Sequence, residues 1–167
     1  MRVKFFDKMR QKISGSHPRI AVLGALRSGT NLVSALLQNH WYATVDDSAY
    51  GWKHAPVPVI SPQSGLSYPD VPILFVTKNP YAFTLSLFRY ADLDHNEVSR
   101  ISVRGQRRFE EFLRSPIFLR DSQLPGSPEL RFANPIDYWT HVNWNWATLD
   151  QKRFRSLHLR YEDVIAD

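Results

Sequence analysis

The sequence contains no cysteine, and this absence excludes disulfide bonds and thiolate metal sites. Long apolar runs are also missing, because no stretch approaches the roughly 18–20 residues that are needed to cross a bilayer. The basic start, Met1–Lys12, holds only a short apolar cluster around Phe5 and Phe6, which is too short for the core of a signal peptide. We therefore expect a soluble, cytoplasmic protein without a transmembrane segment.

Length and composition predict one globular domain. The 167 residues are 43% apolar and 22% charged, which is ordinary for a folded domain with its own core. The formal net charge of +5 favours an anionic partner, but it does not separate nucleotides, nucleic acids and anionic lipids. We divide the chain into a basic N-terminal segment, residues 1–18, whose spacing suits a short amphipathic helix, and a domain at residues 19–167.

The domain alternates strand-like and helix-like stretches. Strands are expected at Ile20–Leu23, Pro72–Lys78 and Ser156–Tyr161, with a short second strand within Tyr42–Asp47 or ending at Gly51–His54. Helices are expected at 32–40, with Leu32, Ala35, Leu36 and His40 on the apolar face, and at Tyr81–Tyr90, Gln106–Arg114 and Pro135–Leu149. Asn79 and Asn134 are the expected N-caps, and Leu119–Asn134 is expected to be a loop. This order predicts an α/β fold: a P-loop-type, three-layer α/β/α arrangement with a mostly parallel sheet of about four strands.

The first strand leads into a polar turn, Gly24-Ala25-Leu26-Arg27-Ser28-Gly29-Thr30, with a glycine at each end. A strand, such a loop and a helix together point backbone N–H groups at an anion. The glycine spacing is that of a nucleoside-triphosphate P-loop, but Thr30 and Asn31 stand where that loop needs Lys and then Ser or Thr. We therefore set kinases and NTPases aside. Arg27 with the hydroxyls of Ser28 and Thr30 suits a phosphate-like group that carries a second oxyanion.

Residues 25–31 resemble the 5′-phosphosulfate loop of the sulfotransferase family, which uses 3′-phosphoadenosine 5′-phosphosulfate as its donor. That loop often reads P-R-S-G-T-T, and here Leu26 replaces the proline and Asn31 the last threonine. The resemblance implies that Arg27 contacts the phosphosulfate and supports charge on its bridging oxygen. It also implies that the N–H groups of Ser28, Gly29, Thr30 and Asn31, with the Thr30 hydroxyl, hold the 5′-phosphate.

A second segment resembles the family's 3′-phosphate motif, a basic residue followed by a serine eight positions later. Here the two residues are Lys78 and Ser86, with Asn79-Pro80 between them. Lys78 leaves the end of the predicted strand, and Ser86 lies nearly two turns into the following helix, where it can face back toward Lys78. Lysine replaces the family's frequent arginine, so it supplies a point charge rather than a bidentate fork.

A third segment, Trp52-Lys53-His54-Ala55-Pro56, is similar to the family's Lys-x-His segment, whose histidine is the general base, although Lys53 and His54 are adjacent here. Histidine titrates near neutrality and suits proton removal from an acceptor hydroxyl. The catalytic candidates are therefore His54, Arg27 and Lys53. A structural role for His54, as a strand-end residue bonded to backbone, stays open. Four other residues stay open as the base: Asp46, Asp47, His95 and His141.

The segment Leu157–Val164 resembles the family's R-Y-E-D-L, and we interpret it as architectural, with charges that pair locally. Tyr138, Trp139 and Trp144 are interpreted as core, with a lining for the acceptor or the adenine as the alternative. The resemblance covers Arg19–Val164. Because family members continue well past this segment, we expect either that the chain is truncated at its C-terminal end or that a partner supplies the rest.

The implied function is transfer of a sulfuryl group from 3′-phosphoadenosine 5′-phosphosulfate to a hydroxyl or amine of a small-molecule or carbohydrate acceptor, without a metal and without nucleic acid. Two alternatives remain. One is a truncated or degenerate nucleotide-binding protein without catalysis, and the weaker one is a basic nucleic-acid-binding domain. The oligomeric state stays open, as does the identity of the acceptor.

Overall fold

The computed structural model describes residues 18–56, 67–93, 101–102, 108–119, 129–149 and 154–166. The predicted basic segment lies outside these residues except for Pro18. In chain order the elements are β1 (Arg19–Leu23), α2 (Thr30–Trp41), β2 (Thr44–Val45), β3 (Ile73–Thr77), α3 (Pro80–Leu93), β4 (Ile101–Ser102), α4 (Phe109–Leu113), β5 (Ile117–Leu119), β6 (Leu130–Phe132), α5 (Pro135–Ala147), β7 (Ser156–Arg160) and α6 (Tyr161–Ile165).

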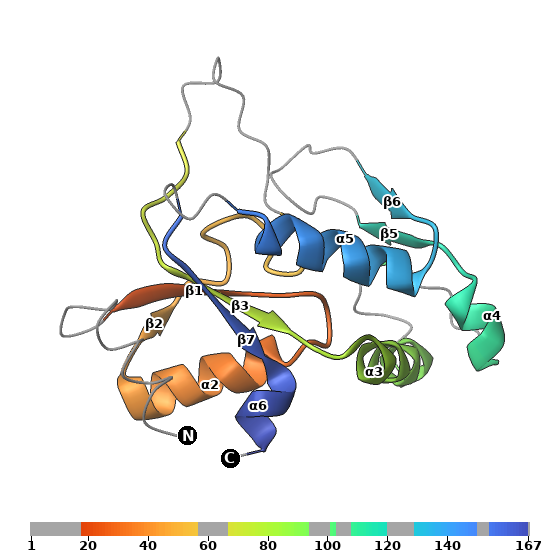
Figure 1. The fold of residues 1–167 in the computed structure, drawn as a ribbon, viewed down its shortest axis with the longest axis horizontal. Coiled ribbons are helices and arrows are strands. Elements are labelled where there is room, and N and C mark those ends of the chain that lie inside the picture. The colour runs from red at the N-terminus through yellow and green to blue at the C-terminus, as the bar shows by residue number, and fades with distance from the viewer. Residues whose placement is uncertain are drawn as a thin grey trace.

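A parallel sheet of four strands, in the order β2-β1-β3-β7, confirms the predicted α/β class (Figure 1). Leu23 of β1 pairs with Phe75 of β3, and Thr77 of β3 pairs with Arg160 of β7. Three of the predicted strands are confirmed to within one residue at each end. Because the strands are parallel, the residues that follow them meet at one edge of the sheet.

Helices flank the sheet on both faces, and the alternation of strand side chains divides the core between them. Figure 1 shows α5 above the sheet and α2 and α6 beneath it. Buried residues on the α5 side include Ala21, Leu23, Ile73, Phe75, Phe83, Leu87, Tyr138, Val142 and Trp146. Buried residues on the α2 side include Ile20, Val22, Val33, Leu37, Leu74, Val76 and Leu159. The central strands are therefore apolar on both faces, which is why they read as continuous apolar runs.

The predicted inward face of α2 is wrong. Leu32 and Leu36 are 41% and 36% exposed, and Ala35 and His40 are exposed as well. The buried positions are Thr30, Val33, Ser34 and Leu37. The sequence offers two apolar pairs four residues apart, Leu32/Leu36 and Val33/Leu37, and the tight loop before Thr30 turns the second pair toward the sheet.

The predicted N-caps of α3 and α5 are confirmed. Asn79 Oδ1 accepts from the Tyr81 N–H at 2.9 Å, and Asn134 Oδ1 accepts from the Asp137 N–H at 2.9 Å. Asp137 Oδ2 in turn accepts from the Ala133 N–H at 2.8 Å, so the start of α5 is bonded reciprocally. Phe83 and Leu87 of α3 are fully buried, as their spacing predicts.

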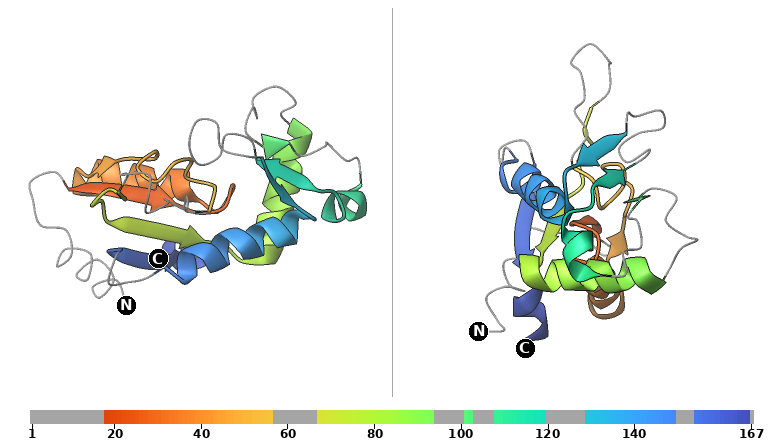
Figure 2. Two further views of the ribbon diagram at one scale, coloured as in Figure 1. Left: turned by 90° about the horizontal axis from the view of Figure 1, so that it is seen from above. Right: turned by 90° about the vertical axis from the view of Figure 1, so that its right-hand side faces the viewer.

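Two other predictions for irregular segments are wrong. Residues 51–55 form turns rather than a strand end, because Gly51 has a φ of 87° and the Ala55 N–H donates to the Trp52 carbonyl at 2.9 Å. The predicted loop at Leu119–Asn134 contains the end of β5 and all of β6. In a second, antiparallel sheet, β5 pairs with β4 on one side and with β6 on the other. Figure 2, left, shows this small sheet beside α3 and α5. Of the predicted helix Gln106–Arg114, α4 covers Phe109–Leu113, and residues 106–107 lie outside the described residues.

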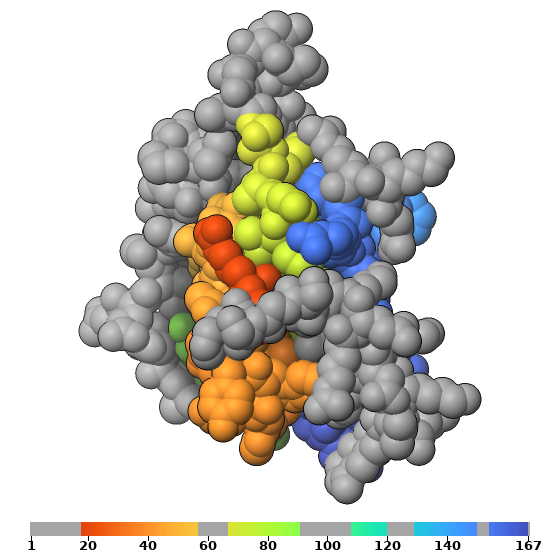
Figure 3. Space-filling view, turned by 90° about the vertical axis from the view of Figure 1, so that its left-hand side faces the viewer, coloured from red at the N-terminus to blue at the C-terminus, as the bar shows by residue number. Residues whose placement is uncertain are grey.

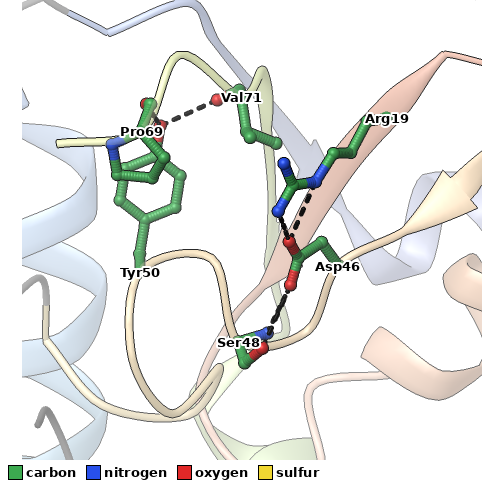
Figure 4. Close-up of polar contacts among 6 residues, drawn as sticks. All are labelled: Arg19, Asp46, Ser48, Tyr50, Pro69 and Val71. Atoms are coloured by element: carbon green, nitrogen blue, oxygen red, sulfur yellow. Dashed lines mark hydrogen bonds and ion pairs between the residues drawn. The ribbon is translucent and has the colours of Figure 1, made fainter.

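The amino ends of the strands are closed by polar contacts. In Figure 3 the start of β1 (red) lies between α2 (orange) and the segment that leads into β3 (yellow). Arg19 forms an ion pair with Asp46, which also accepts from the Ser48 N–H at 3.1 Å (Figure 4). The Tyr50 hydroxyl lies 2.8 Å from the carbonyl oxygens of both Pro69 and Val71. These contacts hold the segments before β3 against β1 and β2.

Candidate functional site

Four segments that are far apart in the sequence meet at the carboxyl edge of the sheet. Gly24 follows β1, Lys78 follows β3 and Tyr161 follows β7. The Lys78 ammonium lies 4.7 Å from the centroid of the Tyr161 ring. The turn at residues 52–55 joins them, because the Gly24 N–H donates to the Lys53 carbonyl at 3.0 Å. The structure therefore places the loop, Lys53, His54 and Lys78 next to one another.

Close packing explains both glycines of the loop. A Cβ on Gly24 would lie 2.3 Å from the Val76 carbonyl oxygen of β3 and 2.6 Å from Ser28 Oγ. Gly29 has a φ of 98°, in the left-handed region, and a Cβ there would lie 2.2 Å from the Tyr161 ring. The loop is therefore seated between β3 and the Tyr161 ring, and neither glycine admits a side chain without a shift of its neighbours.

The loop contains a buried hydroxyl that is not satisfied. Ser28 is 1% exposed, and its Oγ has no hydrogen-bond partner among the described residues. Such a group costs about 1–3 kcal/mol, a cost that an oxyanion acceptor in the loop would relieve. Gly29, the N-cap of α2, has no side chain to accept from the first helical N–H groups, which include those of Thr30 and Asn31.

One predicted anion contact is corrected. The Ser28 N–H donates to the Ala25 carbonyl at 3.0 Å, so it closes a turn within the loop and does not point at a ligand. The reason is the tight curvature of the segment between the two glycines, where a residue in the left-handed conformation, Arg27, reverses the chain. The N–H groups of Gly29, Thr30 and Asn31 remain as the predicted donors.

Arg27 and Lys78 lie at this edge, and neither forms an ion pair with a carboxylate of the described residues. Arg27 has a φ of 66°, and its guanidinium lies 5.0 Å from the centroid of the Tyr90 ring in α3. Burial and the charge of Arg27 lower the pKa of Lys78, while Glu162 opposes this shift. The two like charges thus create a positive potential that an anion would stabilise.

His54 is held against the loop in a defined tautomer. It is 7% exposed, and its Nδ1 lies 2.8 Å from the Gly24 carbonyl oxygen. A carbonyl oxygen only accepts, so Nδ1 carries the proton of the neutral ring and Nε2 keeps its lone pair. Burial lowers the pKa of His54 to about 4, the bond to Gly24 opposes this shift, and the Lys53 charge adds to it. At pH 7 the ring is therefore neutral, with the tautomer that a base needs.

Lys53 is the one predicted catalytic cation that is paired within the described residues. Its Nζ forms an ion pair with Asp47 and donates to Asn31 Oδ1 at 3.0 Å. Asn31, expected to offer its backbone N–H, therefore also holds Lys53 beside the first turn of α2. Asp47, one of the alternative bases, is occupied by this pair. Lys53 therefore adds less positive potential to the loop than Arg27 or Lys78 does.

Ser86 lies in α3, the helix that follows Lys78. It is half-buried and one turn before Tyr90, whose ring lies beneath Arg27. It thus lies on the same side of α3 as the Arg27 contact. Lys78, at the end of β3, is further held by its carbonyl, which accepts from Trp139 Nε1 at 2.8 Å.

The other described candidates for the general base, Asp46 and His141, do not lie at the loop. Asp46 pairs with Arg19, at the amino end of β1, and His141 is an exposed residue whose ring lies 5.6 Å from that of Phe132. His95 lies outside the described residues. Among the candidates that the structure describes, His54 is the one bonded to the loop through its ring.

Sequence reasoning missed three residues that hold the site together. Tyr161 packs on Gly29, Glu162 Oε1 accepts from the Asn79 N–H at 2.8 Å, and the Tyr138 hydroxyl bonds to both the loop and the His54 segment. The expectation that the R-Y-E-D charges pair locally is therefore wrong for Glu162. The sequence did hold one signal for Tyr161 and Glu162. Both directly follow a predicted parallel strand, and residues in that position lie at the edge of the sheet where ligands bind. Of the three aromatic residues, Tyr138 is core, Trp139 is half-buried and Trp144 is 70% exposed.

In the part of the chain that the structure describes, no three His, Asp or Glu side chains are grouped so that they could hold a metal ion. The described helices include none that is long and apolar enough to span a membrane. Comparison of the chain with known protein families, with curated proteins and with solved structures finds no match.

Proposed function

We propose that this chain is a sulfotransferase with a P-loop-type, three-layer α/β/α fold. It binds 3′-phosphoadenosine 5′-phosphosulfate at the carboxyl edge of the sheet and transfers the sulfuryl group to an acceptor hydroxyl or amine. The observation that carries the proposal is a pair of cations, Arg27 and Lys78, that follow adjacent parallel strands beside the buried Ser28 hydroxyl. Within the part of the chain that the structure describes, the cations have no carboxylate partner and the hydroxyl has no hydrogen-bond partner. An anion bound at this edge would offset the cost of both features.

The residues fit a ligand that carries two separate anionic groups. Arg27, Ser28 and the first turn of α2 would hold the 5′-phosphosulfate, and Lys78 with Ser86 would hold the 3′-phosphate. The two cations come from different strand ends rather than from one loop, which suits a nucleotide with phosphates at both the 5′ and 3′ positions. The resemblance of both segments to sulfotransferase motifs selects this nucleotide among others.

The chain's own residues supply proton transfer and charge stabilisation. The donor supplies an activated sulfuryl group, whose sulfur bonds to the acceptor oxygen as its bond to the 5′-phosphate oxygen breaks. His54 Nε2 accepts the proton of the acceptor hydroxyl, because Nδ1 is committed to the Gly24 carbonyl. Arg27 supports the negative charge that grows on the leaving phosphate oxygen. Protonated His54 then returns its proton to solvent.

Calorimetric titration tests the donor site. The full chain should bind 3′-phosphoadenosine 5′-phosphate at least tenfold more tightly than adenosine 5′-phosphate. This ratio of dissociation constants corresponds to a difference of about 1.4 kcal/mol in binding free energy. Lys78→Met should remove this preference. Arg19→Gln is the matched control, because it removes a cation that is paired with Asp46 at the amino end of β1. Equal binding of the two nucleotides by the wild-type chain would overturn the assignment of Lys78 and Ser86.

A non-catalytic nucleotide-binding protein is the second candidate, and the burial of His54 favours it. A base with a pKa of about 4 accepts a proton less readily than a free histidine does. Transfer of labelled sulfate from the donor to a panel of hydroxyl compounds separates the two functions. If the wild-type chain transfers sulfate and His54→Asn does not, the chain is an enzyme. If the wild-type chain binds the nucleotide tightly through its 3′-phosphate but transfers no sulfate, the second candidate is supported.

A further inference from the structure

Tyr138 of α5 connects the loop to the segment that carries His54. It is fully buried, and its hydroxyl accepts from the Leu26 N–H at 2.9 Å and donates to the His54 carbonyl at 2.8 Å. From these two bonds we infer that Tyr138 is a positioning residue, which fixes the anion-binding loop and the base relative to each other. The inference rests on the proposed function of those two parts.

The chemistry of the phenol explains why a tyrosine stands here. A buried N–H and a buried C=O each need a partner, and one hydroxyl oxygen can serve both because it accepts and donates. Burial raises the pKa of Tyr138, so the phenol keeps the proton that it donates to the His54 carbonyl. Phenylalanine would fill the same space and leave both backbone groups without a partner.

Aromatic neighbours from two other elements fix the ring. The centroid of the Tyr138 ring lies 6.0 Å from that of Phe83 in α3 and 5.3 Å from that of Phe132 in β6. The hydroxyl therefore has a fixed position rather than a range of positions. The second sheet thus contributes to the site, because Phe132 of β6 is one of the two rings that contact Tyr138.

The two bonds of Tyr138 complete a closed ring of contacts. His54 Nδ1 donates to the Gly24 carbonyl, and the Gly24 N–H donates to the Lys53 carbonyl. Leu26, two residues further along the loop, then bonds to Tyr138, which bonds back to His54. The ring of His54 and the Tyr138 hydroxyl thus join the base segment to the loop at Gly24 and at Leu26. Without the hydroxyl the contacts at Gly24 and the bond from Lys53 Nζ to Asn31 would remain, but Leu26 would lose its link to the base segment.

Trp146 provides a matched control from the same helix. It is 1% exposed, and its Nε1 donates to the carbonyl of Ala55, the residue after His54, at 3.0 Å. Trp146 therefore anchors the same turn as Tyr138, but among the described residues no hydrogen bond joins its side chain to the loop. Trp146→Phe removes one bond to the turn, whereas Tyr138→Phe removes one bond to the turn and one to the loop.

The test compares Tyr138→Phe and Trp146→Phe in the full chain, after thermal unfolding shows that both variants fold. Tyr138→Phe should weaken binding of 3′-phosphoadenosine 5′-phosphate about fivefold, the loss of one hydrogen bond, and lower kcat for sulfate transfer roughly 100-fold through misplacement of the base. Trp146→Phe should leave nucleotide affinity within about twofold. Equal nucleotide affinity in the two variants would overturn the inference.

Two further measurements test the positioning role of Tyr138 independently of the proposed function. Hydrogen exchange at the Leu26 amide should accelerate in Tyr138→Phe and not in Trp146→Phe, and NMR titration should show the pKa of His54 rising toward its ordinary value in Tyr138→Phe. Neither measurement needs a nucleotide. Failure of the wild-type chain to bind the nucleotide would overturn the proposed function, whereas unchanged Leu26 exchange in Tyr138→Phe would overturn the positioning role itself.

Discussion

The burial of His54 predicts that titration of this residue lowers the stability of the chain in mild acid. In the folded state the pKa of His54 is about 4, compared with 6.5 for an exposed histidine. Between these two values the unfolded state binds the proton and the folded state does not, so stability rises with pH in this window and falls as the pH drops through it. The full difference corresponds to about 3 kcal/mol, of which roughly 2 kcal/mol is lost between pH 7 and pH 5.

The perturbation that isolates this effect is His54→Asn. An asparagine amide places an N–H near the position of Nδ1, so the bond to the Gly24 carbonyl is retained while the titration is removed. Urea unfolding of wild type and variant at pH 7, 6 and 5 gives the difference in unfolding free energy at each pH. His158, whose pKa burial also lowers, titrates in both proteins and cancels in this difference.

We expect the stability advantage of the wild type over His54→Asn to shrink by roughly 2 kcal/mol from pH 7 to pH 5. Parallel stability curves would refute the reasoning, because they would mean that His54 is not held neutral by burial. The same shift has a consequence for the proposed reaction. The acid limb of the kcat/KM profile should lie near the pKa of His54, about 4, and the profile should be flat around 6.5.

Two further predictions concern the backbone of the loop. Arg27 has a φ of 66°, so Arg27→Gly should be about 1 kcal/mol more stable in urea unfolding than Arg27→Ala, while neither variant binds the nucleotide. Equal stabilities would mean that Arg27 is not strained. A Cβ on Gly24 would lie 2.3 Å from the Val76 carbonyl oxygen, so Gly24→Ala should lower the unfolding free energy by about 1–3 kcal/mol. A melting temperature equal to that of the wild type would contradict this packing.

The elements that could be predicted from the sequence are those whose signal is local. The central strands β1 and β3 are apolar on both faces, so they appear as continuous runs. The caps at Asn79 and Asn134 act within three residues of their own position, and the glycine-bounded loop is likewise a local pattern.

The parts that could not be predicted depend on contacts between distant residues or on competing local patterns. The inward face of α2 was ambiguous because two apolar pairs share the same spacing. The strands β5 and β6 contain three residues each, too few for an alternation to be recognised. The two hydrogen bonds of Tyr138 span 112 and 84 residues, so no local pattern marks that side chain as more than core.

Cations at the two ends of the parallel sheet have different partners, and this contrast supports the proposed site. At the amino ends, Arg19 pairs with Asp46, and Arg155, just before β7, pairs with Asp70 at 2.9 Å. At the carboxyl edge, Arg27 and Lys78 lie over tyrosine rings instead, and in the described part of the chain neither has a carboxylate partner. A tyrosine face attracts a cation by about 0.5–2 kcal/mol but carries no net negative charge, so the positive potential at this edge persists. On the proposed function, Arg27 and Lys78 are the charges that the donor would neutralise, beside the loop that the Tyr138 hydroxyl joins to His54.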